Sequence, residues 1–168
     1  IQKIYWRNSD LDFNSIELLL SSLKKYPIQN FFIHKKNALD EINLRYLIND
    51  NEINKFLHTK KNLYLLWNIC QIPDFEKLFN DNYLLLLKNI FLTLINNNHN
   101  IPEDWIKNKV SRLNNFAGGI PELSIKISQI RTWTYISNNH EWCINSYYWR
   151  EKTQQIENEL SDHLHNSL

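Results

Sequence analysis

Apolar side chains recur at intervals of three and four residues along most of the chain, with polar and charged side chains between them. This spacing is typical of amphipathic helices, which bury one apolar face against a core. No segment shows the sustained alternation of a strand. We therefore expect an all-α fold class, a multi-helix domain of about eight helices. The predicted ranges are about 10–23, 37–48, 51–57, 60–70, 83–96, 102–113, 121–136 and 146–168.

Several predicted boundaries carry residues that suit helix ends. Asp10 and Asp12 offer side-chain oxygens to the start of the first helix, and Asn51 offers one to the third. Pro102 is expected in the first turn of its helix, where no amide hydrogen is needed. Residues 118–119 are the only glycines in the chain and predict a turn between two helices.

The stretch 83–95 is apolar on almost every side and is predicted to be the central, most buried helix. It is interrupted by polar residues and is too short to span a bilayer, so no membrane contact is expected. Just before it, Asp74 is expected to cap a short helical turn through Phe75, Leu78 and Phe79.

The domain organisation is expected to be simple. Residues 1–9, IQKIYWRNS, predict a short extended N-terminal segment, either a strand or a linker from a preceding domain. Residues 10–168 then form one helical region. The chain contains no Met, begins with Ile1 and ends at Leu168 inside a helical pattern. These features indicate a segment of a longer protein.

Charge is nearly balanced but unevenly distributed. The net charge of +1 argues against a protein whose whole surface binds polyanions. However, residues 24–61 carry eight Lys or Arg against four acids, and residues 141–162 carry two against five. The basic stretch is either a phosphate-binding face or an ordinary set of solvated helix faces.

The sequence argues against three kinds of site: nucleotide-binding loops, metal sites and disulfide or redox cysteines. A phosphate-binding Walker A loop and a dinucleotide-binding loop need separated glycines, and the two glycines here are adjacent. His140 and Cys143 have a possible metal-ligand spacing, but no second pair accompanies them. The two cysteines form no CxxC motif, and free thiols suit a reducing compartment. We expect no catalytic residue, cofactor or metal in this chain.

Tryptophans at helical spacing allow two interpretations. Trp105, Trp133, Trp142 and Trp149 could stack on nucleic-acid bases, or they could fill a helical core. Arg131 lies two residues before Trp133, so these two side chains could grip a single strand or clamp two helices together.

Five phrases, in this order, cover nearly the whole chain: WRNSDLDFNSIELLLSSL (6–23), LWNICQIPDF (66–75), IPEDWI (101–106), IRTWTYISNNHEW (130–142) and WREKTQQIENELSDHLHNSL (149–168). Together they resemble the helical region that follows the two motor domains in relatives of the mitochondrial degradosome RNA helicase. The part from about residue 120 resembles that family's C-terminal domain. The chain departs from the pattern at residues 166–167, where relatives usually carry a pair such as Glu-Arg.

The resemblance implies that the parent protein is an ATP-dependent DExH helicase of superfamily 2. Its ATP and magnesium site would lie in two RecA-like motor domains, so this chain alone should be inactive as an enzyme. The helical region would pack on the parent's own motor domains and help hold single-stranded RNA or DNA. Organellar relatives act with an exoribonuclease in RNA decay. The expected location is the bacterial cytoplasm, or the mitochondrial matrix for an organellar protein.

The candidate nucleic-acid-binding residues are the paired lysines of the basic stretch and the Arg–Trp pair near the C-terminal end. They are Lys24, Lys25, Lys35, Lys36, Lys60, Lys61, Arg131 and Trp133. Two alternatives from other classes stay open. One is a helical protein-interaction module without nucleic-acid contact, and the other is a small helical enzyme.

Overall fold

The computed structural model describes residues 3–77 and 81–168, which contain eight helices and one two-stranded sheet. The expected all-α class is confirmed, with the sheet as a small addition. The chain divides into two compact units, residues 1–71 and 72–168. We call them the N-terminal and C-terminal units. A boundary at this point was not predicted from the sequence.

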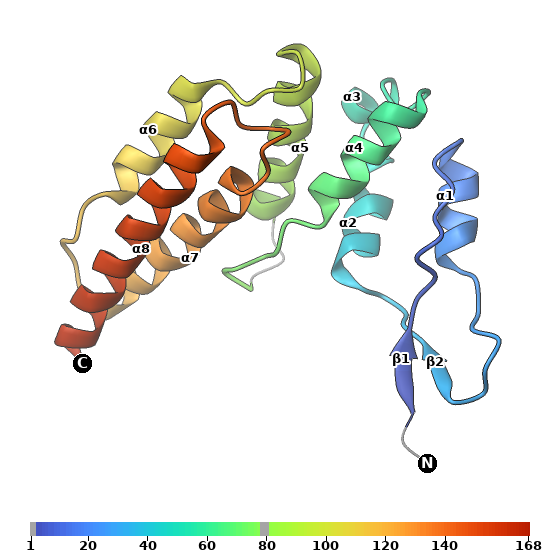
Figure 1. The fold of residues 1–168 in the computed structure, drawn as a ribbon, viewed down its shortest axis with the longest axis horizontal. Helices are drawn as coiled ribbons and strands as arrows, with labels where there is room; N and C mark the ends of the chain where they lie inside the picture. Colours follow the sequence, from blue (N-terminus) through green and yellow to red (C-terminus); the bar gives the residue numbers. More distant parts are fainter. Residues whose placement is uncertain (1–2, 78–80) are drawn as a thin grey trace. The chain divides into compact units, whose positions relative to one another are not determined.

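The N-terminal unit begins with β1 (Ile4–Trp6), which confirms the extended segment. Its partner β2 (Phe32–His34) was not predicted. The strands are parallel, with Ile4 opposite Phe32 and Trp6 opposite His34. A parallel pair needs a crossover connection, which α1 (Ile16–Leu23) provides (Figure 1).

The first helix starts later than predicted. Its N-cap is Ser15, whose hydroxyl accepts a hydrogen bond from the Leu18 amide at 3.1 Å. The prediction of Asp10 or Asp12 as the cap was wrong. The Asp12 carboxylate instead accepts from the Asn14 backbone at 3.0 Å, so it closes a local turn before the helix.

Three further helices complete the N-terminal unit: α2 (Leu39–Leu47), α3 (Asn51–Asn54) and α4 (Lys60–Cys70). Asp50, and not the predicted Asn51, caps α3 by accepting from the Glu52 and Ile53 amides. In the buried space between α2 and α4, the Asn43 side chain donates to the Cys70 carbonyl at 2.9 Å. This bond ties the end of α4 to α2, with apolar residues packed around it.

The C-terminal unit contains the four longest predicted elements after residue 72. They are α5 (Asp81–Asn96), α6 (Glu103–Leu113), α7 (Ile120–Ser137) and α8 (Ser146–Ser167). Helices α7 and α8 lie side by side over most of their length, and α6 packs against α7 (Figure 1). Pro102 is the residue before α6 and lies outside its first turn. The predicted turn at 118–119 is confirmed, and Gly118 has a φ of 112° that favours glycine.

Helix α5 is strongly buried on one side only. Leu87, Ile90, Phe91 and Leu94 are completely buried, which confirms a deep core position. Leu85 on the same helix is 52% exposed, so apolar character on every side did not produce burial on every side. Of the predicted turn before α5, Leu78 and Phe79 lie outside the described residues.

Candidate nucleic-acid interface

The two units differ in charge although the chain is nearly neutral. The N-terminal unit carries ten Lys or Arg against seven Asp or Glu, a net charge of +3. The C-terminal unit carries nine against eleven, a net charge of −2. All six candidate lysines belong to the N-terminal unit, whereas Arg131 and Trp133 belong to the C-terminal unit.

Four candidate lysines lie near one another in the N-terminal unit. Lys24 and Lys25 follow the last turn of α1, and Lys35 and Lys36 follow β2. A hydrogen bond of 3.1 Å between the His34 ring Nε2 and the Leu23 carbonyl joins the end of β2 to the end of α1. We call Lys24, Lys25, Lys35 and Lys36 the α1–β2 lysine group. All four side chains are exposed.

An aromatic side chain lies within this lysine group. The ring of Tyr26 is 65% exposed, and its centroid is 4.9 Å from that of His34. The Lys36 ammonium lies 5.9 Å from the Tyr26 ring centroid. Exposed aromatic rings among cations are typical of surfaces that bind single strands. Tyr26 was not among the predicted residues, although its position directly after two lysines was a usable signal.

Lys60 and Lys61 form a second, separate group in the first turn of α4. Thr59 caps this helix by accepting from the Asn62 amide at 3.2 Å. The helix begins at the end of the unit away from the two strands (Figure 1). Trp67, seven residues along α4, lies about 10 Å further on by helix geometry, beside Arg7. Lys60 and Lys61 therefore lie on another part of the N-terminal unit than the α1–β2 lysine group.

None of the six lysine ammonium groups forms an ion pair among the described residues. Unpaired surface cations are available to phosphates without first breaking an existing contact. The candidate cation in the C-terminal unit differs. Arg131 is half-exposed, and its Nε lies 3.5 Å from a Glu157 carboxylate oxygen. This ion pair joins α7 to α8, and Glu157 partly neutralises the charge of Arg131.

Trp133 is in the core rather than on a surface. Its side chain is 5% exposed and meets Trp105 edge to face, with ring centroids 5.5 Å apart. Such packing leaves little ring surface on which a base could stack. Of the other candidate tryptophans, Trp142 and Trp149 are also buried. Trp149 donates its ring hydrogen to Glu103 at 3.1 Å, which joins α8 to α6.

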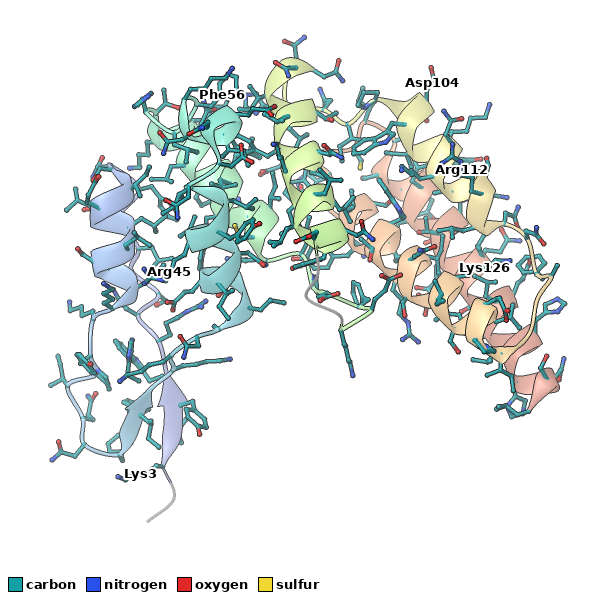
Figure 2. All side chains as sticks on the ribbon, turned by 180° about the vertical axis from the view of Figure 1, so that it is seen from behind. Lys3, Arg45, Phe56, Asp104, Arg112 and Lys126 are labelled. Carbon is teal, nitrogen blue, oxygen red and sulfur yellow. The ribbon has the colours of Figure 1, made fainter. Side chains whose placement is uncertain are left out.

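Another basic residue of the C-terminal unit, Lys126, is engaged in local contacts. The Lys126 ammonium donates to the carbonyls of Asn115 and Ala117, at 2.7 and 3.0 Å, and so holds the loop between α6 and α7. Lys126 and Arg112 are labelled in Figure 2, on α7 and α6. Acidic residues are abundant on α8. This unit therefore offers fewer sites for phosphate than the N-terminal unit.

Near the α1–β2 lysine group, Arg7 is held in a fixed position. Its guanidinium donates two hydrogen bonds to the two Asp40 oxygens, at 2.5 and 2.8 Å, and lies 3.8 Å from Glu41. The bond to Asp40 raises the pKa of Arg7 above its ordinary value, although burial opposes this rise. The guanidinium also lies over Trp67, 5.3 Å from the ring centroid.

The described residues show no group of three or more His, Cys, Asp or Glu side chains placed to bind a metal ion. Within them, no helix is both long enough and apolar enough to cross a membrane. Cys70 and Cys143 are buried free thiols, and burial raises the pKa of both, that of Cys143 to about 11. Neither thiol is activated as a nucleophile.

No protein family, curated protein or solved structure matches this chain.

Proposed function

We propose that this chain is the helical accessory region of an ATP-dependent helicase and helps to hold single-stranded RNA or DNA beside the motor domains. The proposal rests mainly on the five sequence phrases between Trp6 and Leu168, which occur in the same order as in the helicase family that they resemble. Three of the phrases include much of a helix, since the first covers α1, the fourth the end of α7 and the last nearly all of α8.

The α1–β2 lysine group supports the strand-holding part of the proposal. Four exposed cations and the exposed Tyr26 ring lie together on a unit of net charge +3. A single strand presents repeated phosphates and flat bases, which these two kinds of side chain bind. ATP hydrolysis would remain with the parent's motor domains, and this chain alone should not turn ATP over.

The helicase assignment is tested on the gene. The reading frame that contains the Ile1 codon should encode, upstream, a Walker A loop and a DExH box. A start codon directly before Ile1, with no motor motifs in frame, would overturn the helicase proposal.

Strand holding is tested by titrating labelled oligo-uridine at several salt concentrations. Cation–phosphate pairs release counterions when a single strand binds, so removing one such pair should lower the salt slope by about 0.7. We expect the double change of Lys35 and Lys36 to Ala to weaken binding and to reduce this slope. The change of Lys60 and Lys61 to Ala shows whether the second group also takes part.

The matched control removes two positive charges from the C-terminal unit, at Lys107 and Lys152. These side chains share a hollow with Glu103 and Asp104, whose carboxylates disfavour phosphate. Binding should change little in this variant. Equal decreases of affinity in the Lys35/Lys36 variant and in the control would mean that overall charge, and not the α1–β2 lysine group, is responsible.

A protein-interaction module is the second candidate. Its support is an exposed apolar surface at the start of α8, where Ile144, Tyr147 and Tyr148 are all exposed. This alternative predicts no binding of oligo-uridine at any salt concentration. The same titration therefore separates the two candidates.

A further inference from the structure

A hollow in the N-terminal unit lies beside the α1–β2 lysine group. Its volume is about 430 Å³, and Arg7, Ser9, Leu11, Lys35, Trp67 and Gln71 line it. This volume lies in the range of small-molecule sites, about 300–1,000 Å³, but the hollow is open to solvent. It therefore offers a surface for one nucleotide of a longer strand and not an enclosed cavity. All of these residues belong to one unit.

Arg7 contributes a flat surface to the hollow more than a charge. Asp40 binds the guanidinium through both oxygens, and Glu41 lies 3.8 Å away, so nearby carboxylates already balance its charge. One face of the guanidinium lies over Trp67, and the side chain remains 24% exposed. Because planar guanidinium groups stack on bases, the face turned away from Trp67 suits a nucleobase.

Lys35 contributes the uncompensated positive charge. Its ammonium forms no ion pair among the described residues, whereas its backbone amide donates to the Trp6 carbonyl at 2.7 Å. The hydrogen bond to β1 therefore fixes the backbone of Lys35, from which its side chain lines the hollow. A phosphate is the natural ligand of such an ammonium group.

We propose that this hollow binds one nucleotide of a single strand, with the base stacked on Arg7 and a neighbouring phosphate paired with Lys35. This inference rests on the proposed function, because it assigns one subsite of the strand that the chain would hold. The amide of Gln71 and the hydroxyl of Ser9 both donate and accept hydrogen bonds, so the hollow has no built-in preference for one base.

The test compares oligo-uridine with an abasic sugar–phosphate strand of the same length, on the whole 168-residue chain. Wild type should bind oligo-uridine more tightly, because only that strand has bases. Arg7→Lys keeps the charge and removes the flat surface. We expect its affinity for oligo-uridine to fall about five- to tenfold and its affinity for the abasic strand to match that of wild type. Lys35→Gln should weaken binding of both strands equally.

Two further variants make the result specific. Arg150→Lys is the matched control, because Arg150 also lies over an aromatic ring, 5.2 Å from the Tyr147 centroid, but in the other unit. It should bind both strands as wild type does. Ser9→Leu adds an aliphatic side chain at an exposed position that lines the hollow, and it leaves Arg7 and Asp40 unchanged. It should reduce the preference for bases even if Arg7→Lys fails to fold.

The failures of the two proposals are distinguishable. If Arg7→Lys and Ser9→Leu keep the wild-type preference for oligo-uridine, the nucleotide subsite is overturned and strand holding by the chain stands. If wild type binds neither strand, both the subsite and the strand-holding function are overturned.

Discussion

The N-terminal and C-terminal units are built on similar cores but carry different surfaces. Each buries a set of completely inaccessible leucines and isoleucines, and each contains one buried free thiol. The N-terminal unit exposes unpaired lysines around Tyr26, whereas the C-terminal unit engages Arg131 and Lys126 in local contacts. The net charge of +1 conceals this difference. The charge of each unit, and not that of the whole chain, therefore indicates which ligands its surface suits.

The largest expected effects test the similarity of the cores. Leu66 on α4 and Leu87 on α5 are both completely buried, one in each unit. Changing either to Ala should lower the free energy of unfolding by about 2–5 kcal/mol, because it removes packed methyl groups and leaves a cavity. Urea denaturation measures this free energy.

Leu85→Ala is the control, because Leu85 lies on α5 and is half-exposed. It should cost less than about 1 kcal/mol, since little buried surface is removed. Costs below about 0.5 kcal/mol for Leu66→Ala or Leu87→Ala would mean that the residue does not lie in a packed core.

The next effect concerns the ion pair that distinguishes the N-terminal unit. Asp40→Asn removes the carboxylate charge that binds Arg7 in a partly buried site. We expect a decrease of about 1–3 kcal/mol in the free energy of unfolding, because Arg7 loses its paired carboxylate charge and Asn offers one acceptor oxygen in place of two. Glu151→Gln breaks the more exposed pair with Arg150 in the C-terminal unit and should cost less than about 0.5 kcal/mol. Equal costs would show that the Arg7–Asp40 pair has no special role.

The long helices could be predicted from the sequence because their periodic apolar positions are local. Residues 60–70 and the start near Ser146 were placed correctly, since both helices carry a periodic apolar stripe. Helix caps were placed less well. Asp12 had the right chemistry for an N-cap, but its carboxylate binds the neighbouring Asn14 backbone, and Ser15 caps the helix instead. Competition between such local hydrogen bonds is not visible in a pattern.

The sheet could not be predicted. Strand β2 has three residues, too few to show alternation, and its partner lies 28 positions earlier, Ile4 opposite Phe32. The grouping of the lysines depends on the same tertiary structure. The bond from His34 to Leu23 brings two pairs together, and the start of α4 keeps Lys60 and Lys61 apart. Candidate residues could be chosen from the sequence, but tertiary contacts decide which of them can act together.

A smaller effect is expected at alkaline pH. Burial raises the pKa of the Cys143 thiol to about 11, whereas an unfolded thiol titrates near 8.5. Between these values the unfolded state releases its proton first, so the stability supplied by the neutral buried thiol falls as pH rises. By pH 10 this decrease should reach about 1–2 kcal/mol.

Cys143→Ala should make the free energy of unfolding less dependent on pH between 8 and 10, measured by urea denaturation at each pH. Part of the dependence should remain, because burial also raises the pKa of Cys70 in the N-terminal unit. An identical pH dependence in wild type and variant would contradict the assignment to Cys143.

The smallest expected effect concerns Arg131, the candidate phosphate-binding cation of the C-terminal unit. Glu157→Gln removes its ion-pair partner across α7 and α8, and because Arg131 is half-exposed, stability should change by less than about 1 kcal/mol. The informative measurement is oligo-uridine affinity. If Arg131 contacts phosphate, freeing it from Glu157 should strengthen binding. Glu159→Gln is the control, since it removes the same charge from the same helix. Equal affinities in the two variants would indicate that Arg131 joins the two helices and does not contact phosphate.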